Sequence, residues 1–97
     1  MRHFFRTQLP PATVLRMADE FFPQLPLDRT AHTARSRTFS GLLGTIQLSA
    51  KKEGGHYTFV EVNTDQVGES RLDRNAKRFF VELHRTSDPG HRLEAAY

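Results

Sequence analysis

Residues 56–64 carry Tyr57, Phe59 and Glu61 at every second position, and this segment of the chain best fits a binding site. Successive side chains of a strand point to opposite faces, so Tyr57, Phe59 and Glu61 would share one side. Two rings that can stack and one carboxylate that accepts hydrogen bonds suit an apolar small molecule or a second copy of the chain. An interior strand with Tyr57 near its rim is the other interpretation of the same pattern.

Residues of the types used in catalysis are scattered. Glu61 and Asp65 are two carboxylates near one strand end, but the sequence supplies no second element to complete an acid–base pair. The five histidines lack the i, i+4 or clustered spacing of metal sites, and the glycines form no phosphate-binding signature. We therefore expect a non-catalytic domain that holds no cofactor and no metal.

Positive charge gathers in two parts of the chain, and no Asp or Glu lies between Arg29 and Lys52. The basic residues in question are Arg35, Arg37, Lys51 and Lys52 of that stretch, and Arg71, Arg74 and Arg78 of a later helix. Side chains of this kind reach phosphates, so nucleic acid is the alternative partner. A solvated helix face with Arg78 paired to Glu82 also explains the second set.

The first third of the chain predicts a short edge strand and then a helix. Residues 1–9 mix apolar and polar types, and Pro10 and Pro11 end any strand there. Proline fits the first turn of a helix, where its missing N–H would have no partner. The apolar residues that follow recur on one side of a helix that runs to Phe22, before Pro23.

The middle of the chain predicts three strands. Residues 24–28 form a connector, and residues 30–40 indicate one strand rich in Thr, Ser and Ala. Residues 45–50 then alternate polar and apolar types, which points Ile46, Leu48 and Ala50 toward the core. The glycines of 53–55 supply the hairpin turn that leads into residues 56–64.

A long second helix closes the predicted fold. Ser70 and Asp73 have the spacing of a capping box, and an apolar stripe continues from there to about Arg85. We expect residues 91–97 to be a frayed tail. The prediction is an α+β domain, with a short strand, a helix, a three-stranded antiparallel run and a long C-terminal helix packed on one face of the sheet.

Length and composition predict one domain over residues 1–97, because a chain of this size holds a single core. There is no cysteine, which excludes disulfides and thiolate metal sites and fits a reducing compartment. No apolar run approaches the roughly 20 residues of a membrane span. We therefore expect a soluble, cytoplasmic protein without a membrane partner.

Several spaced motifs resemble the START-like helix-grip superfamily, which includes polyketide cyclases and lipid-transfer proteins. They are Pro11-x-x-Val14, Ala18-Asp19, Pro23, the turn Glu53-Gly54-Gly55 and the C-terminal helix. The family has about six strands after its first helix and this sequence predicts about three, so the resemblance implies a reduced version. A reduced sheet would have an open edge, and an open edge invites pairing with another chain. It therefore implies a homodimer.

The order of helix, three strands and helix is also similar to the double-stranded-RNA-binding domain. Arg74, Ala76 and Lys77 match the Lys-Lys-x-Ala-Lys run that opens the second helix of that family. Asp73 stands in place of a lysine, and the Gly-Pro-x-His loop of the family is missing from residues 40–44. This resemblance implies duplex binding through the basic residues.

Overall fold

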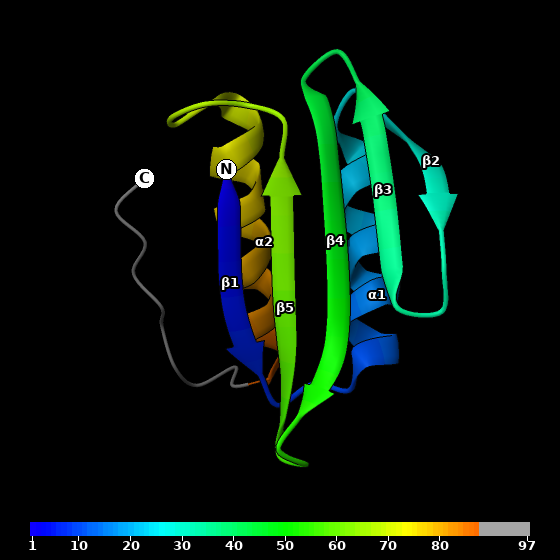
Figure 1. The fold of residues 1–97 in the computed structure, drawn as a ribbon, viewed down its shortest axis with the longest axis vertical. Helices are drawn as coiled ribbons and strands as arrows, with labels where there is room; N and C mark the ends of the chain where they lie inside the picture. The colour runs from blue at the N-terminus through cyan, green and yellow to red at the C-terminus, as the bar shows by residue number, and fades with distance from the viewer. Residues whose placement is uncertain (88–97) are drawn as a thin grey trace.

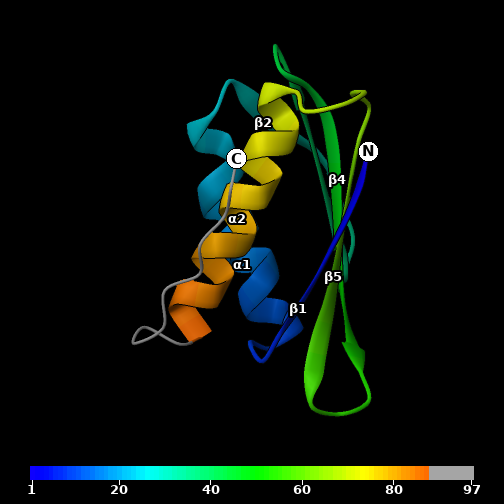
Figure 2. The ribbon, with the colours of Figure 1, turned by 90° about the vertical axis from the view of Figure 1, so that its left-hand side faces the viewer.

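The computed structural model describes residues 1–87, which form a five-stranded antiparallel sheet with two α-helices on one side (Figures 1 and 2). The elements are β1 (Arg2–Thr7), α1 (Pro11–Phe21), a 3-10 turn (Phe22–Gln24), β2 (Leu27–His32), β3 (Ser36–Gly41), β4 (Gly44–Glu53), β5 (Tyr57–Thr64) and α2 (Arg71–Ser87). The predicted α+β class is confirmed. The predicted frayed tail, 91–97, lies outside the described residues.

The sheet has the strand order β1-β5-β4-β3-β2. Strands β2 to β5 form a continuous meander, and β1 adds to its last strand, pairing Phe4 with Glu61 and Arg6 with Phe59. Helix α1 packs behind β3 and β4, while α2 packs behind β1 and β5 (Figure 1). We call the helix-covered side the inner face and the opposite side the outer face.

The single strand predicted over residues 30–40 is wrong, because the chain reverses within it. Strand β2 begins at Leu27, in the predicted connector, and β3 begins at Ser36, so four strands follow α1 rather than three. The reversal uses the Thr33 hydroxyl, which accepts the Arg35 N–H at 3.1 Å and bonds the Ser36 hydroxyl at 2.7 Å. A Ser/Thr turn of this kind carries no Gly or Pro signal.

The core lies between the helices and the inner face. Ile46, Leu48 and Ala50 are fully buried, as the alternation along β4 predicts. Phe22, Phe39 and Phe79 fill the space behind them, with the Phe39 centroid 5.2 Å and the Phe79 centroid 5.1 Å from that of Phe22. Apolar burial on this one face supplies most of the stabilisation of a domain this small.

The two predicted helix starts are confirmed. Pro10 precedes α1, and its carbonyl accepts the N–H groups of Thr13 and Val14. The Ser70 hydroxyl caps α2, accepting the Asp73 N–H at 3.0 Å and donating to the Asp73 carboxylate at 2.6 Å. The helix itself begins one residue later, at Arg71.

The β3–β4 turn requires a glycine at position 44. Gly44 has a φ of +118°, and a Cβ there would come within 2.5 Å of the side chains of Asp65 and Gln66. Only glycine adopts this backbone without strain. The turn therefore fixes the register of β4 against β3.

Candidate functional site

The outer face carries the side chains that the sequence selects for binding. Tyr57, Phe59 and Glu61 point to this side of β5, while Thr58, Val60 and Val62 are buried on the other. Neither of the two helices covers this face, as Figure 2 shows from the sheet edge. Tyr57 remains 46% exposed.

Strand β1 adds an aromatic ring that sequence reasoning missed. The Phe4 ring stacks on Phe59 with centroids 5.4 Å apart and an interplanar angle of 26°. Phe5, its neighbour, points inward and stacks on Phe80 at 5.1 Å. The sequence did contain a signal for this ring. Phe4 and Phe5 are adjacent in an edge strand, and alternation places one of two adjacent rings on each face.

Three cations lie against these rings. The Arg2 guanidinium lies 5.0 Å from the Phe4 centroid, the Arg6 guanidinium 5.1 Å from Phe59, and the Lys51 ammonium 5.7 Å from Phe59. Cations within about 6 Å of a ring face are attracted by its quadrupole. The rings and cations therefore form one continuous patch over β1, β5 and β4, which we call the aromatic patch.

Two acids balance part of this charge. Glu61 accepts hydrogen bonds from Asn63 at 2.9 Å and from Arg2 at 3.1 Å, and these bonds lower its pKa below the ordinary value. Glu53 pairs with Arg6 at 2.7 Å. The patch thus presents both charge signs beside exposed rings, and the lowered pKa of Glu61 keeps that acid ionised at neutral pH.

The rest of the outer face is polar and built mostly of short side chains. The outward residues of β3, and of β4 before Lys51, are Ser36, Thr38, Ser40, Thr45, Gln47 and Ser49, placed by the register of the two strands. The hydroxyls of Ser40 and Thr45 lie 3.1 Å apart and bond across the strands. These six residues offer hydrogen-bonding groups without rings or charges.

The two carboxylates near the end of β5 do not have the raised pKa that a general acid needs. Asp65 accepts the Thr45 N–H at 3.0 Å and a hydrogen bond from Gln66 at 2.8 Å, which lower its pKa. The pKa of Glu61 is lowered as well. A general acid near neutral pH needs a raised carboxyl pKa, so neither group is suited to that role.

The structure separates the basic residues named by the sequence. Arg37 turns to the inner side and donates to both carboxylate oxygens of Asp19 at 3.1 Å, and Arg29 pairs with the same Asp19 at 3.2 Å. Arg35, Lys51 and Lys52 instead line one groove of about 450 Å³. The stretch is therefore not the single positive surface that its composition predicts.

The helical arginines form a second, distant set. Arg71, Arg74 and Arg78 are exposed on α2, which begins at the end of the molecule opposite the β2–β3 turn (Figure 1). The predicted ion pair between Arg78 and Glu82 is not formed within the described chain, where Glu82 pairs with Arg85 at 3.2 Å. The two basic sets thus lie on different elements and do not form one continuous surface.

A buried polar cluster joins β1, β5 and the start of α2. The Asp73 carboxylate, 1% exposed, contacts His3 Nε2 at 2.8 Å and accepts hydrogen bonds from Thr64 at 2.8 Å and Ser70 at 2.6 Å. Burial raises the pKa of Asp73, but the hydrogen bonds from Ser70, His3 and Thr64 outweigh it and hold the pKa below its ordinary value. The sequence predicts the Ser70 contact and not the other two.

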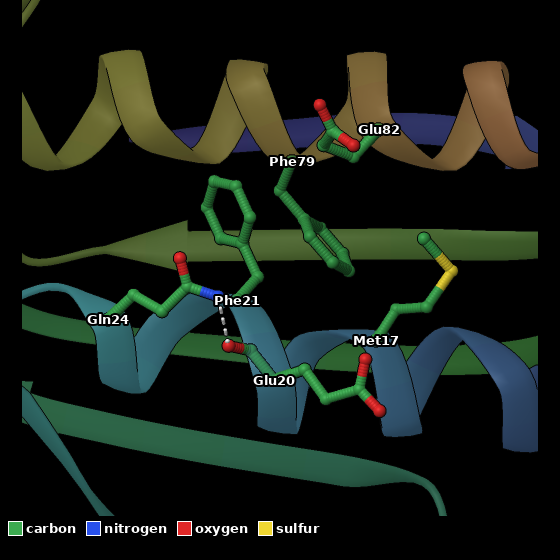
Figure 3. A pocket seen from close by; sticks show the side chains of 6 residues that line it. All are labelled: Met17, Glu20, Phe21, Gln24, Phe79 and Glu82. Atoms are coloured by element: carbon green, nitrogen blue, oxygen red, sulfur yellow. Dashed lines mark hydrogen bonds between the residues drawn. The ribbon is translucent and has the colours of Figure 1, made fainter.

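A small groove lies between the two helices (Figure 3). Its lining residues are Met17, Glu20, Phe21, Gln24, Phe79 and Glu82, and its volume is about 160 Å³. The Phe21 and Phe79 rings lie side by side in it, with centroids 5.4 Å apart. Ligand sites usually measure at least about 300 Å³, so this groove is too small for most organic ligands.

Within residues 1–87, no three His, Asp or Glu side chains gather in a way that could hold a metal ion. No helix of this part of the chain has the length and apolar character needed to cross a membrane. Compared with known proteins, the chain matches no family model and no curated sequence.

Proposed function

We propose that this protein is a non-catalytic domain that self-associates, with the outer faces of two copies packed against each other. One observation carries the proposal: the stacked pair of Phe4 and Phe59 lies on a sheet face that neither α1 nor α2 covers. Phe4 is 49% exposed and Tyr57 46% exposed. Contiguous exposed rings on a small domain mark an interaction surface.

The charges of the aromatic patch favour a second copy as the partner. An isologous interface brings the same surface together twice, so the surface must complement itself. The patch carries Arg2 and Arg6 beside Glu53 and Glu61, and each cation can exchange its own acid for the partner's. A polyanion would meet both signs, which argues for self-association over nucleic acid at this face.

The size of the face suits a stable dimer. The sheet has five strands, and its longest strand, β4, has 10 residues. At the usual spacings of strands and residues, the face is roughly 24 Å wide, about 33 Å long at β4 and about 20–26 Å long at the other strands. A standard interface buries about 800 Å² on each partner, which is on the order of this face. The short hydroxyl side chains over β3 and β4 allow close approach.

The element order supports the proposed relation to the helix-grip superfamily in reduced form. A short strand, a helix, strands linked by hairpins and a C-terminal helix follow one another here, and four strands follow α1 where the family has about six. Phe22, Phe39 and Phe79 occupy the space between helices and sheet. Because these rings fill the space where an enclosed apolar ligand would bind, we assign the binding role to the outer face instead.

Light scattering with size-exclusion chromatography tests the proposal. The natural protein is expected to run as a dimer at micromolar concentration, and Phe59→Ser should shift it to a monomer. Leu42→Ser is the matched control, because Leu42 is 91% exposed on the β3–β4 turn, outside the face. A monomer at all concentrations, or equal effects of the two substitutions, would contradict the proposal.

A further inference from the structure

A basic groove lies at the end of the molecule where α1 begins. Its volume is about 450 Å³, and its walls come from the start of α1, the β2–β3 turn and the end of β4. The side chains that matter for binding are Pro11, Ala12 and Ala34 on the apolar side, and Arg35, Lys51 and Lys52 on the basic side. Most small-molecule sites measure about 300–1,000 Å³, so the groove has ligand size.

The backbone that carries Arg35 is fixed on both sides. Its N–H donates to the Thr33 hydroxyl at 3.1 Å, and its carbonyl accepts the Ala50 N–H at 3.0 Å. The β2–β3 turn is thereby tied to β4, next to Lys51 and Lys52. A turn held in this way fixes the Arg35 backbone beside the end of β4, so Arg35 and Lys52 line the same groove.

The positive charge of the groove has no acid to balance it. No Asp or Glu lines it, and among residues 1–87 the Arg35 guanidinium and the Lys52 ammonium form no ion pair. Nearby acids are committed elsewhere: Asp19 binds Arg29 and Arg37, and Glu53 binds Arg6. Two unbalanced cations beside a low-dielectric wall attract an anion.

Few N–H groups at the start of α1 are available to an anion. Those of Thr13 and Val14 both bond the Pro10 carbonyl and Pro11 has none, which leaves the Ala12 N–H. Lys51 is shared with the aromatic patch, because its ammonium lies 5.7 Å from the Phe59 centroid. The anion would therefore depend on Arg35 and Lys52.

We infer that this groove binds a small organic anion. The sulfonate, carboxylate or phosphate of the ligand lies between Arg35 and Lys52, where the planar guanidinium can donate two parallel hydrogen bonds. The apolar part of the ligand lies on Pro11, Ala12 and Ala34. Of the residues that line the groove, only Lys51 also belongs to the aromatic patch, and the anion site does not depend on the proposed function.

The test uses 8-anilinonaphthalene-1-sulfonate and its uncharged parent, N-phenyl-1-naphthylamine, as fluorescent probes. The anionic probe should bind with one-to-one saturation, and its affinity should exceed that of the parent at least about tenfold, the factor that about 1.4 kcal/mol provides. Amide NMR shifts should map to the start of α1 and to residues 34–35 and 50–52. Equal affinity for both probes, or shifts confined to β1 and β5, would overturn the inference.

Two matched double substitutions separate a site from general charge. Arg35→Gln with Lys52→Gln should weaken the anionic probe at least about tenfold. Arg71→Gln with Arg74→Gln removes the same charge at the far end of the molecule and should change the affinity less than about twofold, as expected for screened, distant charges. Equal losses in both proteins would overturn the inference.

Two further measurements keep the outcomes distinct. Phe59→Ser, the variant designed to break self-association, should retain probe binding. Probe binding therefore tests the groove whether or not the protein forms a dimer. Phenyl phosphate should displace the probe. Displacement by duplex RNA and not by phenyl phosphate would overturn the inference and favour the nucleic-acid alternative.

Discussion

The inner and outer faces of the sheet use the same alternation for different purposes. Along β5 the inward Thr58, Val60 and Val62 are at most 1% exposed, while the outward Tyr57 is 46% exposed. Inward rings such as Phe39 pack in the core, whereas the outward Phe4 stacks at the surface under an arginine. The inner face holds the fold together, and neither helix covers the outer face.

The largest difference between the faces is expected for ring removal. Phe39→Ala should lower the free energy of unfolding by about 3–5 kcal/mol. The reason is the cavity that it leaves among fully buried side chains. Phe4→Ala, on the outer face, should cost about 1 kcal/mol or less, the value of one exposed aromatic pair. Urea unfolding measures both, and equal losses would remove the distinction between the faces.

The second-largest loss of stability is expected for the buried Asp73 carboxylate on the inner side of the sheet. Asp73→Asn should destabilise the protein by about 2 kcal/mol, because an amide cannot replace every hydrogen bond that a carboxylate accepts. Ser70 and Thr64 both donate to this carboxylate, and His3 contacts it. Asp28→Asn, on the exposed strand β2, should stay within about 0.5 kcal/mol. Denaturant midpoints compare the two proteins.

The pH dependence of the unfolding free energy gives a second test of the role of Asp73. The pKa of Asp73 in the folded protein is lower than its ordinary value of 3.8, so this carboxylate stabilises the fold fully at higher pH. That contribution decreases as the pH falls from about 5 through the folded pKa. The difference in unfolding free energy between the natural protein and Asp73→Asn should therefore shrink toward acid. A difference that grows as the pH falls below about 5 would contradict the assignment.

Arg35 and Arg37 of the β2–β3 hairpin should also behave differently. Arg37→Gln should cost about 1–2 kcal/mol, because it removes charged hydrogen bonds from a partly buried carboxylate. That carboxylate is Asp19, which accepts two bonds from the Arg37 guanidinium. Arg35→Gln should change the unfolding free energy by less than about 0.5 kcal/mol, since Arg35 forms no ion pair within the described chain. Thermal unfolding at matched salt measures both.

The smallest effect on folding is expected for an ion pair of the outer face. Arg6→Gln removes the contact with Glu53, and the two side chains are 58% and 42% exposed. Solvent screens such pairs, so the unfolding free energy should change by less than about 0.5 kcal/mol. The dimer should dissociate more readily, because Arg6 lies over the Phe59 ring within the proposed interface. An effect on folding as large as that of Arg37→Gln would break the comparison.

Local patterns predicted the elements that carry strong signals. The two prolines at the start of α1, the capping box of α2 and the alternation along β4 and β5 each depend on neighbours in sequence, and each is confirmed. The reversal at residues 33–35 was missed because a threonine hydroxyl makes it, in a stretch of Ser and Thr that also suits a strand. The outward residues of β5 followed from the same alternation.

Helix and strand periodicities alone predict two amphipathic helices and the β5 side chains that share a face, and the glycines of 53–55 predict the hairpin turn before β5. The packing of the folded chain is what sets β1 beside β5, which brings Phe4 to Phe59 and His3 to Asp73 from distant parts of the chain. It also turned Arg37 inward to Asp19 and left Arg35 with Lys52 on one groove. Pairing between distant segments depends on the packing of the whole core, and no local pattern records it.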